Sequence, residues 1–234
     1  MPRKVDLNAL LEKRARHFKR MPRLQQMDRR YFELFRAFKA AQGAKSIARR
    51  SRRELCRYFP IALVALIEGY QKVLYRDLID SGEPFLSNAE NFRDIRASLD
   101  ALIETRKKTL SLGEFIAEQL SHNSLGQIES NLGILLGQDF GFEFTRRLKQ
   151  DDAAAGHTVF QTHLRRVLVE LFRQRRVFCH ELAPRAHADA HLVETMFKVT
   201  RVFPQIVEEH VWELTGRDRE VELRKLRRSW KKIH

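Results

Sequence analysis

Apolar residues recur along this chain at intervals of three and four, and no stretch alternates apolar and polar residues for long. The clearest case is segment 24–41, where four apolar residues stand at i, i+3, i+4 and i+7 and therefore share one helical face. They are Tyr31, Leu34, Phe35 and Phe38. Glycine and proline, which interrupt helices, number only 10 and 6 in 234 residues. The sequence therefore predicts an all-α fold, a helical bundle with short connections.

The same periodicity continues along most of the chain. We expect helices over 7–20, 24–41, 58–79, 95–120, 125–136, 158–180 and 186–214. Because proline is favoured in a first turn, Pro60 marks a helix start. Gly113 could split the fourth of these helices, and Pro204 interrupts the last. Residues 83–92 are expected to form a loop.

Two further segments carry local signals. Ser124 to Gln127 match a capping box, which satisfies free amides at a helix start, and Gly137 ends the helix that follows. The irregular stretch 138–156 contains three alternating phenylalanines, Phe140, Phe142 and Phe144. This alternation permits a short strand or a lid, although anchoring to the core is the preferred interpretation.

Positive charge is concentrated at the two ends of the chain, whose formal net charge is +14. Residues 1–60 hold 18 Lys and Arg against 5 Asp and Glu, and residues 217–234 hold 8 against 3. The middle, 61–216, is slightly acidic, with 18 against 22. Such asymmetry is typical of contact with a polyanion, which releases the counterions condensed on a phosphate backbone. We therefore expect nucleic-acid contact rather than helices that are merely rich in solvated arginine.

The composition excludes several classes of protein. The longest apolar run, Ile61 to Ile67, is far shorter than the roughly 18 to 20 residues that span a bilayer. The basic N-terminus lacks the apolar core of a signal peptide. Two cysteines, Cys56 and Cys179, are too few for a disulfide framework or a thiolate zinc site. We expect a cytoplasmic protein without membrane contact.

One arginine interrupts the apolar face of the helix expected over 158–180. On a helical wheel that face comprises Phe160, Leu164, Val167, Leu168, Leu171 and Phe178. Arg175 lies inside the same arc, whereas Arg173 lies on the outer face and Arg176 at the apolar edge. An arginine within a buried stripe must be paired, or must face a groove or a partner chain.

His180 follows five residues after this arginine, and here a family resemblance enters. Segment 168–182, LVELFRQRRVFCHEL, resembles the signature of the HEPN superfamily: an arginine, four to six intervening residues and a histidine near the end of a late bundle helix. Arg175 and His180 have four intervening residues; Arg173 and His180 have six, but Arg173 faces outward. Two further segments resemble the family's first and second helices, IALVALIEGYQKVLYRDLI and LSHNSLGQIESNLGILLGQDF.

The resemblance implies an activity, because many HEPN proteins are metal-independent ribonucleases. Arg175 and His180 would then be the catalytic residues of an RNA endonuclease of toxin or defence type. Histidine can accept the 2′-hydroxyl proton near neutral pH, and a guanidinium can stabilise charge on the pentavalent phosphorus. On a straight helix the two side chains diverge by about 140°. A two-fold homodimer could bring two of each into one cleft, and HEPN sites commonly form at such interfaces.

The resemblance also divides the chain into a basic helical N-terminal extension, 1–53, a HEPN-like helical domain, 54–216, and a basic C-terminal tail, 217–234. Six arginines are expected to bind RNA: Arg176, Arg173, Arg49, Arg50, Arg52 and Arg53. The last four form the densest basic cluster of the extension.

Two alternatives to the endonuclease remain open. Arg176 stands where catalytic members usually carry a small polar residue, which favours a non-catalytic RNA-binding HEPN protein. The second alternative is a docking module whose basic N-terminal helices bind an acidic partner, such as a neutralising antitoxin.

A metal site has one weak candidate. His187 and His191 stand at i and i+4 with Asp189 between them, a spacing found in two-histidine metal sites. No glutamate follows His187 as in a zinc protease motif, and no cysteine is near. Polar helix surface is therefore the preferred interpretation, and we expect no metal and no cofactor.

Overall fold

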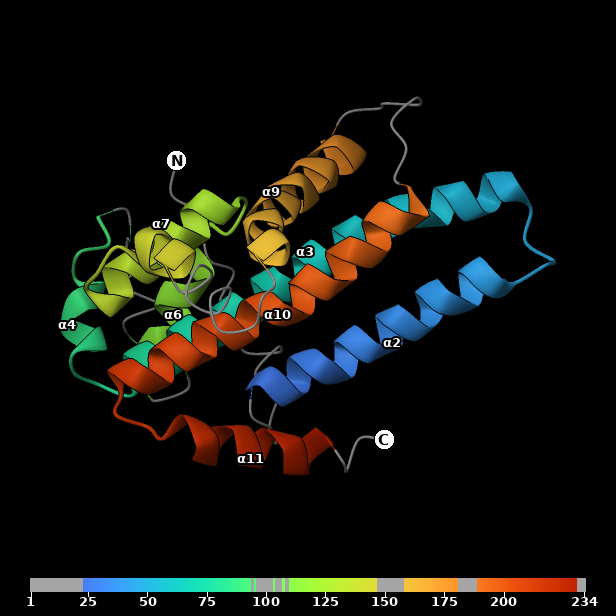
Figure 1. The fold of residues 1–234 in the computed structure, drawn as a ribbon. Coiled ribbons are helices and arrows are strands. Elements are labelled where there is room, and N and C mark those ends of the chain that lie inside the picture. The colour runs from blue at the N-terminus through green and yellow to red at the C-terminus, as the bar shows by residue number, and fades with distance from the viewer. Residues whose placement is uncertain are drawn as a thin grey trace. The chain divides into compact units, whose positions relative to one another are not determined.

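The computed structural model describes residues 23–93, 95, 103, 107, 110–146, 158–180 and 189–230, and every regular element within them is a helix (Figure 1). The side chains of 158–162, 180 and 225–230 lie outside this description. The all-α class predicted from the sequence is confirmed for the described residues. Within the same residues, no helix is both long enough and apolar enough to cross a membrane.

The helices are α2 (Arg23–Gly43), α3 (Arg49–Asp80), α4 (Phe85–Ala89), α6 (Leu112–Gln119), α7 (Leu125–Leu136), α9 (Thr158–His180), α10 (Ala190–Leu214) and α11 (Arg219–Trp230). A further helical segment covers 140–146. The described chain forms two compact units. The first unit contains Arg23 and 69–141, and the second contains 24–68 and 142–230. Helix α3 contributes to both, since the division falls after Glu68.

Aromatic rings form the core of the second unit where α2, α3 and α10 meet (Figure 1). The ring centroid of Phe197 on α10 lies 5.8 Å from Tyr31, 5.3 Å from Phe35 and 5.3 Å from Phe38. It also lies 5.8 Å from Phe59 on α3. The apolar stripe predicted on segment 24–41 is therefore the face through which α2 packs into the core.

Helix α9 packs against α10 through the face that the helical wheel predicted. Its buried residues include Leu164, Val167, Leu168 and Leu171. Phe172 and Gln174 are buried as well, which the wheel did not indicate. The observed bounds of α9, Thr158–His180, coincide with those of the predicted helix. A long amphipathic stripe indicates both where a helix runs and which of its faces is buried.

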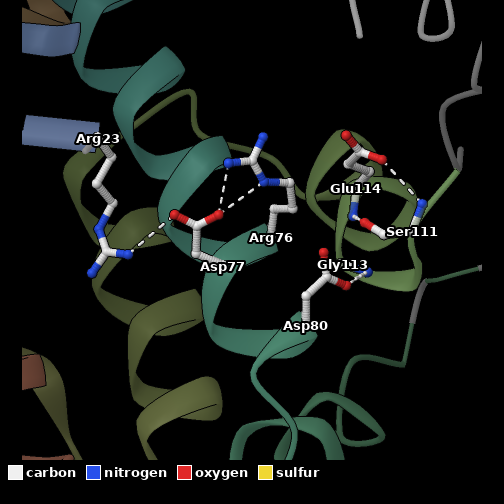
Figure 2. A network of polar contacts seen from close by, with 7 residues as sticks. All are labelled: Arg23, Arg76, Asp77, Asp80, Ser111, Gly113 and Glu114. Atoms are coloured by element: carbon white, nitrogen blue, oxygen red, sulfur yellow. Dashed lines mark hydrogen bonds and ion pairs between the residues drawn. The ribbon is translucent and has the colours of Figure 1, made fainter. Parts of the chain in front are cut away.

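Close packing of α6 on α3 defines the first unit. A Cβ atom at Gly113 would lie 2.5 Å from the carbonyl oxygen of Arg76, so only glycine permits this approach. The Gly113 amide also donates to Asp80 Oδ1 at 2.9 Å (Figure 2). The segment expected over 95–120 does break beside this glycine: α6 begins at Leu112 after its extended N-cap Ser111, so Gly113 lies in the first turn of the new helix. The contact with α3 requires a glycine at this position.

Polar contacts reinforce the same unit (Figure 2). Ser111 caps α6 by accepting from the Glu114 amide at 3.1 Å, and the Glu114 carboxylate accepts from the Ser111 amide at 3.0 Å. Asp77 on α3 accepts from two nitrogens of Arg76, at 2.9 and 2.7 Å, and from Arg23 at 3.2 Å. The complete capping box thus opens α6 and not, as predicted, α7.

At α7 the prediction is half right. Ser124 accepts from the Gln127 amide at 3.2 Å, which confirms the cap. The Gln127 side chain, however, accepts from the amide of Asn123, one residue before the cap, at 3.2 Å. Gly137, with φ of 69°, ends the helix as predicted, because the left-handed region suits glycine.

Both prolines predicted to start or interrupt helices lie inside continuous ones. Helix α3 begins at Arg49 and runs through Pro60, and α10 runs through Pro204. Each proline removes one backbone hydrogen bond, but buried residues on both sides, such as Phe59 and Leu63, hold α3 in place. The four clustered arginines therefore belong to the first turns of α3.

Two segments predicted as irregular contain short helices among their described residues. Residues 83–92 include the short α4, which packs against α7. Phe140 and Phe144 are buried four residues apart while Phe142 is 68% exposed, as expected for the helical segment 140–146. The strand alternative is wrong, and core anchoring is confirmed for the two buried rings.

Candidate functional site

Arg175 lies on α9 opposite a carboxylate of α3. Its Nη2 atom is 3.7 Å from Glu68 Oε1, and the two side chains are 26% and 23% exposed. This distance exceeds that of a hydrogen bond, so the contact is an ion pair. Glu68 Oε1 is buried and accepts no hydrogen bond from the described residues. Within the part of the chain that the structure describes, the arginine of the apolar stripe is therefore paired through this long contact alone.

The neighbouring arginines have different surroundings. Arg173 is 55% exposed on the outer face of α9, and its Nε and Nη2 atoms donate to Glu170 at 2.6 Å each. These hydrogen bonds lower the pKa of Glu170. Arg176 is exposed and has no hydrogen-bond or ion-pair partner among the described residues. Arg173 and Arg175 thus face different sides of α9, as the wheel predicted.

His180 is the last residue of α9, and its side chain lies outside what the structure describes. Helical geometry separates it from Arg175 by about 7.5 Å along the axis and about 140° around it. The assignment of Arg175 and His180 as a catalytic pair therefore stays a prediction.

The basic cluster at the start of α3 contains two kinds of arginine. Arg49, Arg50 and Arg53 are exposed, with no partner among the described residues. Arg52 is partly buried, and its Nη2 atom donates to the carbonyl oxygens of Ala44 at 2.7 Å and Ile47 at 3.4 Å. Arg52 thus holds the connection between α2 and α3, while the other three guanidinium groups face solvent.

The histidine pair proposed for a metal is only partly described. His191 is exposed in the first turn of α10, and His187 lies outside the described residues. Asp189 is the N-cap of α10 and accepts from the Leu192 amide at 3.4 Å. Within the described part of the chain, no three His, Cys, Asp or Glu side chains form a group that could hold a metal ion.

Sequence reasoning missed Glu68. It follows the apolar run that ends at Ile67, and its position resembled the end of a buried stretch more than a functional one. One signal in the sequence could have indicated this pair. Glu68 is an anionic residue in an otherwise apolar helix segment, and Arg175 is a cationic residue in another. Pairing the two requires knowing that α3 and α9 are neighbours, which periodicity alone does not reveal.

Comparison with protein-family models, with curated proteins and with solved structures finds no match for this chain.

Proposed function

We propose that the protein is a metal-independent RNA endonuclease of the HEPN type, in which Arg175 and His180 carry the reaction. The observation that supports it most is the placement of Arg175. Its side chain extends from the packed face of α9 and is 26% exposed, and among the described residues a 3.7 Å contact with Glu68 is its only ion pair. Because no hydrogen bond to Glu68 holds it, this guanidinium can bind a phosphate oxygen, which is an anionic partner like the carboxylate.

The proposed reaction is attack by the ribose 2′-oxygen on the adjacent phosphorus. His180 accepts the 2′-hydroxyl proton as the bond from that oxygen to phosphorus forms. The bond from phosphorus to the 5′-oxygen breaks, and this leaving oxygen takes a proton from a second imidazolium. Arg175 stabilises the charge on the non-bridging oxygens. The products are a 2′,3′-cyclic phosphate and a 5′-hydroxyl.

A homodimer supplies the second histidine in this proposal. Because Arg175 and His180 diverge by about 140° on one helix, a single copy presents them to different sides. Two copies related by a two-fold axis bring equivalent helix ends together. Arg173 and Arg176, together with the exposed arginines of α3, would then bind the RNA backbone on either side. The toxin or defence role follows from the family resemblance.

A second candidate function is RNA binding without cleavage. Two observations favour it: Arg176 stands where a small polar residue is usual in catalytic members, and Glu68 already pairs with Arg175. Both functions require RNA binding, and they differ in whether the bound RNA is cut.

Incubation of the purified protein with total RNA in EDTA tests the proposal. Arg175→Ala and His180→Ala should each abolish cleavage while leaving the helical circular dichroism signal and the melting temperature close to those of the wild type. Arg173→Ala is the matched control, since it removes a guanidinium from the outer face of the same helix and should retain most activity. If Arg173 is essential and Arg175 dispensable, the pair is Arg173 and His180. Wild-type protein that binds RNA but leaves it intact supports the second candidate.

A further inference from the structure

An aromatic ring lies in solvent on α3, two turns after the exposed arginines. Tyr58 is 60% exposed, and Leu55, on the adjoining part of the surface, is 38% exposed. The next residue, Phe59, is buried in the aromatic core around Phe197. Burial of Phe59 fixes the rotation of the helix and therefore holds Tyr58 outward.

Helical register relates this ring to the arginines. Arg50 precedes Tyr58 by eight residues, which places it about 12 Å away along the axis and about 80° around it. Arg53 lies about 7.5 Å from Tyr58 along the same axis but about 140° around it, so it points to a different side of the helix. Arg50 is exposed. The ring and the Arg50 guanidinium thus lie on adjoining parts of the solvent side of α3.

The only carboxylate in these turns is already paired. Glu54 lies one turn before Tyr58, and its Oε2 atom is 3.2 Å from Arg57 Nη1. Arg50 has no such partner among the described residues. Its guanidinium therefore remains available to an anionic ligand that reaches Tyr58.

We propose that Arg50, Leu55 and Tyr58, here called the α3 platform, bind single-stranded RNA. A base stacks on Tyr58, with Leu55 widening the apolar contact, and a flanking phosphate binds Arg50. Stacking on an exposed ring next to basic groups is how proteins bind single strands without sequence preference, whereas the bases of a duplex are not available for it. The inference rests on the proposed RNA-binding function and adds the class of substrate.

A second copy of the chain suits this face less well. Pairing two α3 platforms would place two arginine-rich helix starts on one interface, and like charges across an interface oppose association. Single-stranded RNA brings the opposite charge and a flat apolar surface at once.

Fluorescence anisotropy with a labelled 2′-O-methyl oligouridylate tests the proposal. This probe lacks the attacking hydroxyl, so binding is measured without cleavage. Tyr58→Ala should weaken its binding by about 5- to 100-fold, and Tyr58→Phe should bind within about twofold of the wild type. A blunt-ended, fully paired 2′-O-methyl RNA duplex should bind both variants like the wild type. Phe142→Ala is the matched control, because Phe142 is equally exposed but stands next to Glu143.

The outcomes separate this inference from the function on which it rests. Wild-type protein that binds neither probe contradicts the RNA function itself. Wild-type protein that binds the oligouridylate as tightly as its Tyr58→Ala variant contradicts the α3 platform alone. A Tyr58→Ala variant that becomes monomeric in light scattering, with its RNA affinity unchanged, would instead assign this face to self-association.

Discussion

Glu68 is the residue on which the availability of Arg175 depends. Its carboxylate neutralises the guanidinium at 3.7 Å without a hydrogen bond. A phosphate oxygen that reaches Arg175 must displace this contact. The charge of Glu68 therefore opposes RNA binding at the proposed catalytic arginine, and removing that charge should favour it.

Glu68→Gln should tighten binding of the 2′-O-methyl oligouridylate because it frees Arg175 and keeps the shape of the side chain. The plot of log affinity against log salt should become steeper by about 0.7, the increment for one added phosphate contact on a single strand. Glu33→Gln removes the same charge beside Arg30 on α2 and is the matched control. Equal affinities and equal slopes for the two variants would show that Arg175 binds no phosphate.

Position 113 requires glycine because the backbone of α3 lies too close for a side chain. Gly113→Ala should destabilise the protein by about 1 to 3 kcal/mol, because the new methyl group would overlap the Arg76 carbonyl and Asp80. Thermal unfolding followed by circular dichroism measures the effect. For a chain of this size we expect a lower melting temperature by about 2 to 10 °C.

Gly126→Ala is the control, since no described atom outside its own helix turn lies within 4 Å of its Cβ position and alanine favours a helix. It should melt at or above the wild-type temperature. If both variants melt alike, the close approach of α6 to α3 is wrong.

At the scale of elements, the first turns of α3 contain arginines of two kinds: some are available to bind RNA, and one stabilises the fold. Arg49, Arg50 and Arg53 are exposed, whereas Arg52 donates to two carbonyl oxygens of the preceding connection. Replacing the first three by glutamine should make the salt dependence of RNA affinity shallower by about 2. Cleavage at saturating RNA should change little, because phosphate contacts of this kind position the substrate.

Two controls accompany that triple variant. Arg29→Gln with Arg30→Gln removes equally exposed arginines that share Glu33 on α2, and should leave the slope almost unchanged. Arg52→Ala should instead lower the melting temperature, since its two hydrogen bonds are lost. An unchanged slope for the triple variant would leave the basic start of α3 as scaffold or as a surface for a protein partner.

The elements also show how far the sequence could predict this structure. The periodic stripes of α2 and α9 gave their location, their packing faces and the outward direction of Arg173, because amphipathic periodicity is a local property. The predicted start of α3 at Pro60 is wrong, because the helix begins at Arg49. Packing of Phe59 against α2 and α10 outweighs the preference of proline for a first turn. Gly113 and Glu68 depend on contacts between helices distant in sequence, which no local pattern encodes.

At the scale of the whole molecule, the proposed site requires two copies. The protein should sediment as a dimer, and both copies should contribute to one shared cleft. Arg175→Ala and His180→Ala are each expected to be inactive alone. Mixed dimers of the two variants should recover part of the activity, because their cleft contains one intact arginine and one intact histidine from different copies, and water can protonate the leaving oxygen in place of the second histidine. A strictly monomeric active enzyme would contradict the composite site.

The most direct test of the central claim is the chemistry of the cut ends. A defined single-stranded RNA is incubated in EDTA with the wild type and with the Arg175→Ala and His180→Ala variants, and the product ends are identified by mass spectrometry. The account predicts 2′,3′-cyclic phosphate and 5′-hydroxyl ends for the wild type and no new ends for either variant. Products with 3′-hydroxyl and 5′-phosphate ends, or the same cleavage by both variants, would contradict it.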